Sequence, residues 1–151
     1  GRAQKGEAGG NAVTITNSQT TAYVYGGWTW QDGNADGNTV AMTESSASLV
    51  IGGDAAAGTA KGNVVTITDS QISAAMGGVA SEDASDNVVT LTGSQVSSFV
   101  RGAGSGSGSA AGNSVTITDS LISGSGEGAR AADASGNKVT ITLIDESSIV
   151  R

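Results

Sequence analysis

The amino-acid sequence predicts an all-β protein, built as a parallel β-solenoid of about six coils of 24–27 residues each. Three observations carry this prediction: a repeated hexapeptide, the near-constant spacing of its copies, and two-residue alternation within each copy. The hexapeptide has the form Asn-x-Val-Thr-Ile-Thr, and its copies begin at Asn11, Asn38, Asn63, Asn87, Asn113 and Asn137. We therefore expect an N-terminal lead-in over residues 1–10 and solenoid repeats over residues 11–151.

The copy that begins at Asn63 shows the expected first strand of a coil. Val65 and Ile67 alternate with Thr66 and Thr68, which places the aliphatic side chains on one face and the threonines on the other. A single coil buries too little apolar surface to offset the conformational entropy lost when it orders. Stability must therefore come from stacking, with each strand hydrogen-bonded to its copies above and below.

The rest of this coil is expected to contain a second strand between two turns. Asp69 and Ser70 are turn-forming residues, and residues 71–76 resume a strand pattern. Gly77 and Gly78 predict a second turn, followed by a corner of small residues over 79–86. The coil length favours right-handed winding.

Composition and charge exclude several classes of function. The chain has no cysteine and no histidine, so histidine-based triads, cysteine nucleophiles and histidine-bound metals cannot be built. The net charge of −7 would repel nucleic acid and anionic lipid. No apolar run reaches the roughly 20 residues needed for insertion into a membrane. We expect no enzyme activity and no cofactor, with paired carboxylates for polysaccharide hydrolysis as a weak alternative.

Acidic residues gather at the predicted corners, where Glu44 and Asp69 of adjacent coils should lie close together. A bound cation would relieve their repulsion. The Gly-Gly-x-Gly-x-Asp pattern of calcium-binding β-rolls is absent, however, so we expect no metal site.

The column of asparagines has two interpretations. Its amides could act as a row of ligands, or they could form a structural ladder from coil to coil at a tight turn. Glycine precedes the asparagine in five copies and Asp86 precedes it in the sixth, which predicts an unusual backbone φ at that turn. This pattern favours the ladder. The ladder residues are Asn11, Asn38, Asn63, Asn87, Asn113 and Asn137.

Pairs of threonines are expected to form two outward ranks, about 4.8 Å apart along the axis and about 6.6 Å across it. This arrangement resembles the flat Thr-x-Thr faces of insect-type ice-binding solenoids, although threonine also suits any exposed strand. Ala41 interrupts one rank. Ice binding is therefore an alternative function, and its site would comprise Thr14, Thr16, Thr66, Thr68, Thr90, Thr92, Thr116, Thr118, Thr140 and Thr142.

Four of the five aromatic residues lie within the segment 23–30. Residues two apart on a strand share a face, so Tyr25, Trp28 and Trp30 are the candidate binding site for a sugar or a partner's side chain. The alternative is that they cover the end of the stack. Extra residues in the longer coils fall at 28–37 and 102–112, which predicts that length variation gathers at one corner beside this site.

The unit Gly-Asn-x-Val-Thr-Ile-Thr-Asp-Ser-x-Ile-Ser, followed by Gly-Gly and an Ala-Ser-Gly corner, resembles repeats in the passenger regions of bacterial autotransporters and related large surface adhesins. The resemblance covers residues 11–151. It implies a non-enzymatic stalk segment outside a Gram-negative cell, carrying binding loops for a host glycan or surface protein.

The C-terminal end of the repeats is apolar over residues 139–144 and 148–150. Exposed strand edges of this kind pair readily with further strands. We therefore expect either continuation in a longer solenoid or end-to-end association. A self-assembling structural filament is a further alternative function.

Overall fold

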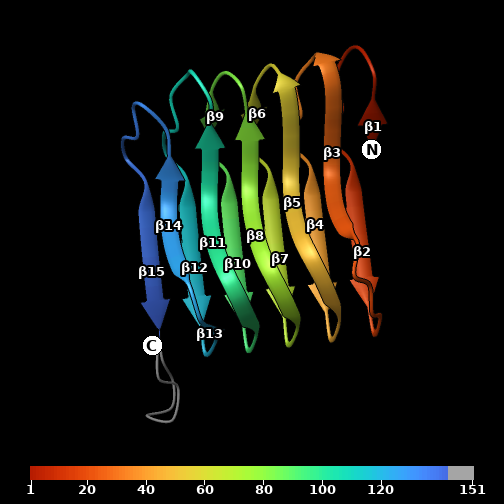
Figure 1. Ribbon diagram of the computed structural model, residues 1–151, viewed down its shortest axis with the longest axis vertical. Coiled ribbons are helices and arrows are strands. Elements are labelled where there is room, and N and C mark those ends of the chain that lie inside the picture. The colour runs from red at the N-terminus through yellow and green to blue at the C-terminus, as the bar shows by residue number, and fades with distance from the viewer. Residues whose placement is uncertain (143–151) are drawn as a thin grey trace.

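The computed structural model describes residues 1–142 and shows a parallel β-solenoid of about six coils, as the repeat predicts (Figure 1). One wall is a six-stranded sheet, which we call the threonine sheet. It contains β2 (Ala12–Thr16), β4 (Thr39–Thr43), β7 (Val64–Thr68), β10 (Val88–Thr92), β12 (Ser114–Thr118) and β15 (Lys138–Thr142).

The opposite wall is a seven-stranded sheet of mostly longer strands, which we call the long sheet. It contains β1 (Arg2–Ala3), β3 (Tyr23–Asp32), β5 (Ser46–Ala57), β8 (Gln71–Ala80), β11 (Gln95–Ser105), β13 (Leu121–Ile122) and β14 (Ser125–Arg130). A short third sheet pairs β6 (Ala60–Lys61) with β9 (Ala84–Ser85).

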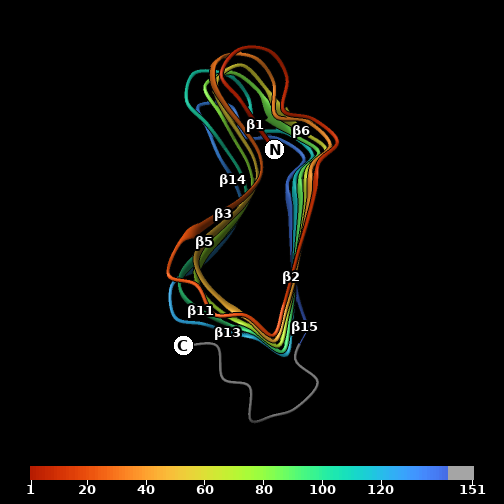
Figure 2. The same ribbon diagram turned by 90° about the vertical axis from the view of Figure 1, so that its right-hand side faces the viewer.

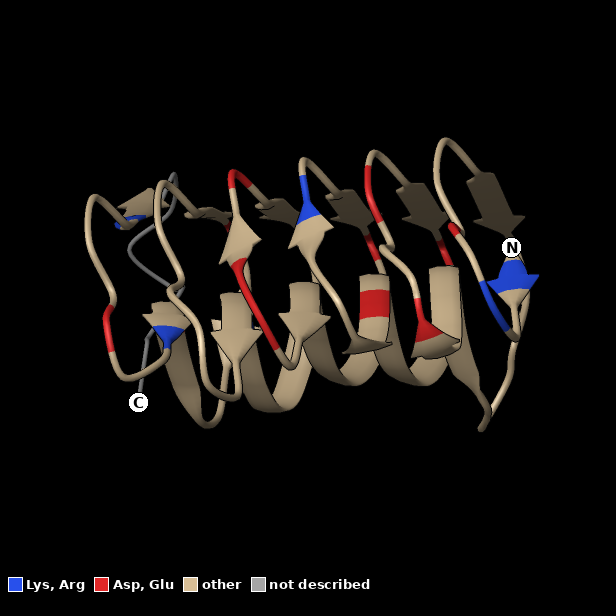
Figure 3. Ribbon diagram, turned by 90° about the horizontal axis from the view of Figure 1, so that it is seen from above, with Lys and Arg blue, Asp and Glu red and all other residues tan. Residues whose placement is uncertain are grey.

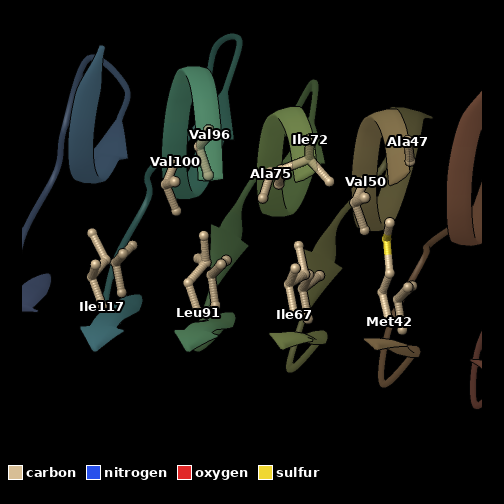
Figure 4. Packing of buried hydrophobic residues seen from close by; sticks show 14 of the residues in the cluster. Met42, Ala47, Val50, Ile67, Ile72, Ala75, Leu91, Val96, Val100 and Ile117 are labelled. Atoms are coloured by element: carbon tan, nitrogen blue, oxygen red, sulfur yellow. The ribbon is translucent and has the colours of Figure 1, made fainter. Parts of the chain in front are cut away.

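The predicted alternation of inward and outward side chains is confirmed in the threonine sheet. Ile117 pairs in register with Leu91 on one side and Ile141 on the other, and only 1% of its surface is exposed. Figure 4 shows the stacked column formed by Met42, Ile67, Leu91 and Ile117, which faces residues of the long sheet across the core. Equivalent side chains of successive repeats stack on one another because adjacent strands of the threonine sheet pair without a register shift.

A left-handed residue precedes the ladder asparagine of every threonine-sheet strand, and another follows five of these six strands. The residue before the ladder asparagine has a positive φ in all six copies, as predicted, and Asp86 adopts φ 58° without being glycine. The residue after the second threonine also has a positive φ at Asn17, Glu44, Asp69, Gly93 and Asp119. Asparagine, aspartate and glycine tolerate this conformation best, which explains most of the turn composition.

The prediction of a turn at Gly77 and Gly78 is wrong. Both residues lie inside β8, which continues through them to Ala80. These glycines instead let the two walls approach, and the coil is narrowed at this level (Figure 2). A Cβ on Gly77 would meet the Gly102 carbonyl oxygen and would lie 2.8 Å from the Cβ of Asn87. Only glycine fits between the walls.

This waist divides each coil into two lobes. The larger lobe holds the aliphatic core between the threonine sheet and the long sheet. The smaller lobe, at the tip, holds a separate core made almost wholly of buried alanines, namely Ala35, Ala55, Ala60, Ala80, Ala84, Ala103 and Ala110. The space inside this lobe is narrow, and the small side chain of alanine fits it.

Residues 1–10 follow the path of the next coil and are hydrogen-bonded onto it. The Trp28 amide donates to the Gly1 carbonyl, and the Gly6 and Ala8 amides donate to the carbonyls of Asp32 and Asn34, each at 2.9 Å. Ala8 is buried. The lead-in is thus part of the stacked structure.

The prediction that length variation gathers at one corner is wrong in part. Gln19 aligns with Ser46, whereas Tyr23 aligns with Leu49, so the first coil holds one extra residue before its aromatic segment. A bulge also interrupts β11 just after Val96. The remaining differences in coil length arise after the paired glycines of the long-sheet strands, as expected. Of the apolar C-terminal segments 139–144 and 148–150, residues 143, 144 and 148–150 lie outside the described part of the chain.

Candidate binding surface

The six repeat asparagines form a continuous hydrogen-bonded ladder along the inside of the waist. The Nδ2 of each donates to the Oδ1 of the next at 2.8–3.0 Å. That Oδ1 also accepts the backbone N–H of the preceding asparagine at 2.9–3.1 Å. Four of the six are fully buried. Their amides are occupied by the protein itself, so this column has a structural role.

A second ladder of serines was not predicted. The Ser45 hydroxyl accepts the backbone N–H of Ser18 at 3.0 Å and donates to the Thr43 carbonyl at 2.7 Å. The same arrangement recurs at Ser70, Ser94 and Ser120. The signal was present in the sequence, because serine stands two residues after the second threonine in five copies.

The two threonine ranks lie side by side on the outer face of the threonine sheet. One rank contains Ala41 between Thr14 and Thr66, and the other also contains Thr43, which was not among the predicted ice-binding residues. Figure 2 shows that the strands of this wall superpose closely down the axis, so the ranks form a flat face. The described sheet thus presents an ordered array of hydroxyl and methyl groups.

The aromatic residues form a row across the outer face of β3. Inward Gly26 and Gly27 occupy two successive positions, so Tyr23, Tyr25, Trp28 and Trp30 all point outward. Neighbouring ring centroids are 6.4, 5.6 and 5.3 Å apart. We call these four residues the aromatic row.

The two middle rings of the row are engaged with other side chains. Tyr25 and Trp28 are stacked with an interplanar angle of 19°, and the Arg2 guanidinium lies over the Trp28 ring, 4.6 Å from its centroid. The two outer rings are open to solvent, with Tyr23 63% exposed and Trp30 58% exposed. Contact with a ligand therefore falls mainly on the outer rings, and of the three predicted site residues Trp30 is the most accessible.

Asp54 adjoins the row on the next coil, where it pairs in register with Trp28. Burial raises the pKa of the Asp54 carboxyl above its ordinary value. The pKa of Tyr25 is also raised, first by burial and then by the nearby Asp54 and Tyr23. Both shifts show that the base of the row is partly desolvated.

A second outer surface is a polar groove that runs along the solenoid axis beside the serine ladder. Its rims carry hydroxyl and amide groups repeated from coil to coil, and charged side chains do not line it. The lining residues include Thr21, Ser48, Ser73, Ser97, Ser123, Gln71 and Gln95.

Acidic side chains do not gather into a recognisable ion site. Glu44 and Asp69 occupy successive positions at the left-handed turn, as predicted. Among residues 1–142, no group of three or more acidic side chains could hold a metal ion. The same range contains no helix long and apolar enough to cross a membrane.

No protein-family model, curated protein or solved structure matches the chain.

Proposed function

We propose that this chain is a non-enzymatic stalk segment of an extracellular bacterial adhesin or autotransporter passenger, and that its aromatic row contacts a glycan ligand. Two properties support the stalk role. Parallel stacking in exact register can continue for any number of coils. The buried asparagine and serine side chains are satisfied by that stacking, which leaves the outer faces available for recognition.

The aromatic row is the observation that carries the binding proposal. Exposed rings present apolar faces to the C–H groups of a sugar, while the tyrosine hydroxyl and the indole N–H offer polar contacts. Four rings in series along one strand let a linear glycan touch more than one of them. The other described coils contribute Phe99 as their single aromatic side chain, so the row is confined to the first coil.

A glycan panel tests this proposal, with binding measured by tryptophan fluorescence and by calorimetry. Replacing both Tyr23 and Trp30 with alanine should weaken binding by roughly tenfold or more, since anchor residues each contribute above about 1 kcal/mol. Leu121→Ala is the matched control, because it removes an exposed apolar side chain (44%) away from the row. Binding that survives the double replacement, or no binding to any glycan, would refute the proposal.

Ice binding is a second candidate, favoured by the flat face of in-register threonines. Thermal hysteresis measured at high protein concentration is the direct assay. If the face binds ice, replacing Thr66 and Thr116 with tyrosine should abolish the activity, whereas Leu121→Ala should leave it unchanged. Absence of hysteresis in the unmodified protein would end this candidate.

A further inference from the structure

A shallow pocket lies beside the exposed end of the aromatic row, where the lead-in meets β3. Its lining consists of Arg2, Gln4 and Trp30. Arg2 pairs in register with Trp28, and the Gln31 amide donates to the Gln4 carbonyl at 3.1 Å, so Gln4 lies next to Trp30. The pocket therefore combines a cation, an amide and an indole ring.

Arg2 is held in place without a carboxylate partner. Its guanidinium rests over the Trp28 ring, a contact that fixes the group yet leaves its N–H donors free in the plane. Among residues 1–142, the ion pair that forms joins Arg101 to Glu127 at 2.8 Å and does not involve Arg2. No acidic group of these residues lies within 4.0 Å of Arg2. An unpaired, positioned guanidinium is well suited to bidentate recognition of a planar carboxylate.

Resting on the proposed glycan-binding function, we propose that this pocket recognises an acidic sugar. The sugar carboxylate would bind the Arg2 guanidinium, the Gln4 amide would hydrogen-bond a hydroxyl or acyl group, and the ring would pack against Trp30. The inference specifies the ligand class: a glycan with a carboxylated unit at the contact point.

The surrounding charge narrows this class further. The whole chain has a net charge of −7, and acidic positions recur along the turns at the tip, whereas basic positions are few and include β1 and the loop after it (Figure 3). Asp54 flanks Trp28 on the side away from Arg2. A polymer charged on every unit would meet repulsion beyond the pocket. The site favours a glycan with one terminal acidic sugar.

The test compares 3′-sialyllactose with lactose, which differ by one carboxylated terminal sugar. The protein should bind the acidic trisaccharide at least about tenfold more tightly. Arg2→Gln should remove this preference, so that the two sugars bind with similar affinity. Lys5→Gln is the matched control, since it removes the same charge from an exposed lead-in residue outside the pocket, and it should retain the preference.

Salt provides a readout that does not depend on the folding of the Arg2 variant. The preference of the unmodified protein should fall as ionic strength rises, because the exposed charge pair is screened. Equal affinity for the two sugars, a preference that is independent of salt, or a preference retained by Arg2→Gln would each overturn the inference. Neutral glycans that still bind through Tyr23 and Trp30 would leave the proposed function intact, whereas failure of the entire panel would refute both.

Discussion

Replacing Asn87 with alanine removes an amide that makes four hydrogen bonds at the centre of the ladder. Its Oδ1 accepts the backbone N–H and Nδ2 of Asn63 at 3.0 and 2.9 Å, and its Nδ2 donates to Ala60 O and Asn113 Oδ1 at 2.8 and 3.0 Å. The variant deprives the Asn63 backbone N–H of its acceptor and the Ala60 carbonyl of its side-chain donor in a fully buried site, whereas the Asn63 Nδ2 still donates to the Ala35 carbonyl. Each buried group left unpaired costs about 1–3 kcal/mol, so we expect a loss of about 2–6 kcal/mol.

Asn11→Ala is the matched control at the end of the same ladder. Asn11 is partly exposed, and its Nδ2 makes one hydrogen bond, to Asn38 Oδ1 at 2.8 Å. After the replacement that oxygen still accepts the Asn11 backbone N–H at 3.1 Å, so no buried group is left without a partner. The expected loss is below about 1.5 kcal/mol.

Equilibrium unfolding in guanidinium chloride, followed by far-UV circular dichroism, measures both variants. Indole fluorescence reports separately on the first coil, where both tryptophans lie, and would reveal any loss of cooperativity between coils. Equal losses for Asn87→Ala and Asn11→Ala would refute the reasoning, because the ladder would then act only through local turn geometry.

Three further predictions concern the core, the waist and pH. Ile117→Asp should abolish cooperative unfolding by burying a carboxylate, whereas Thr116→Asp on the outer face should be mild; similar melting temperatures would contradict the assignment of faces. Gly77→Ala should destabilise by about 3 kcal/mol or more through a clash with the backbone of the next coil, while Gly106→Ala, whose nearest neighbour would be at 3.4 Å, should be close to neutral in thermal melts. Burial raises the folded-state pKa of Asp54 above 3.8, so ionisation opposes folding as pH rises. Asp54→Asn should accordingly stabilise the protein at neutral pH, and this stabilisation should disappear at a pH well below the ordinary carboxyl pKa of 3.8. A stabilisation that does not change with pH would refute this assignment.

Much of the fold follows from the sequence because the repeat fixes register. Once Leu91 and Ile117 are recognised as equivalent, their stacking and inward direction follow from strand geometry alone. The ladder role of the asparagines follows in the same way, since equivalent positions must lie one above another.

The sequence misled where a residue's role depends on tertiary contacts. Gly77 reads locally as a turn residue, and its true role appears only when Asn87 is known to face it across the waist. Ser70 likewise reads as part of a turn, although its hydroxyl accepts the Ser45 amide of the preceding coil. The pocket at Arg2 was not foreseen because Arg2 belongs to no repeat, and its place beside Trp30 depends on the path of the lead-in.

The waist has a consequence for how such a chain can change in evolution. The asparagine ladder separates the smaller, alanine-filled lobe from the larger aliphatic lobe. Coils of different length nevertheless pair in the same register in the threonine sheet. An insertion or deletion in the tip therefore does not shift the register of the next threonine-sheet strand. Whole units that begin at the asparagine can be duplicated, lost or exchanged by recombination without a compensating mutation elsewhere, so the number of coils is free to drift while each coil keeps its core.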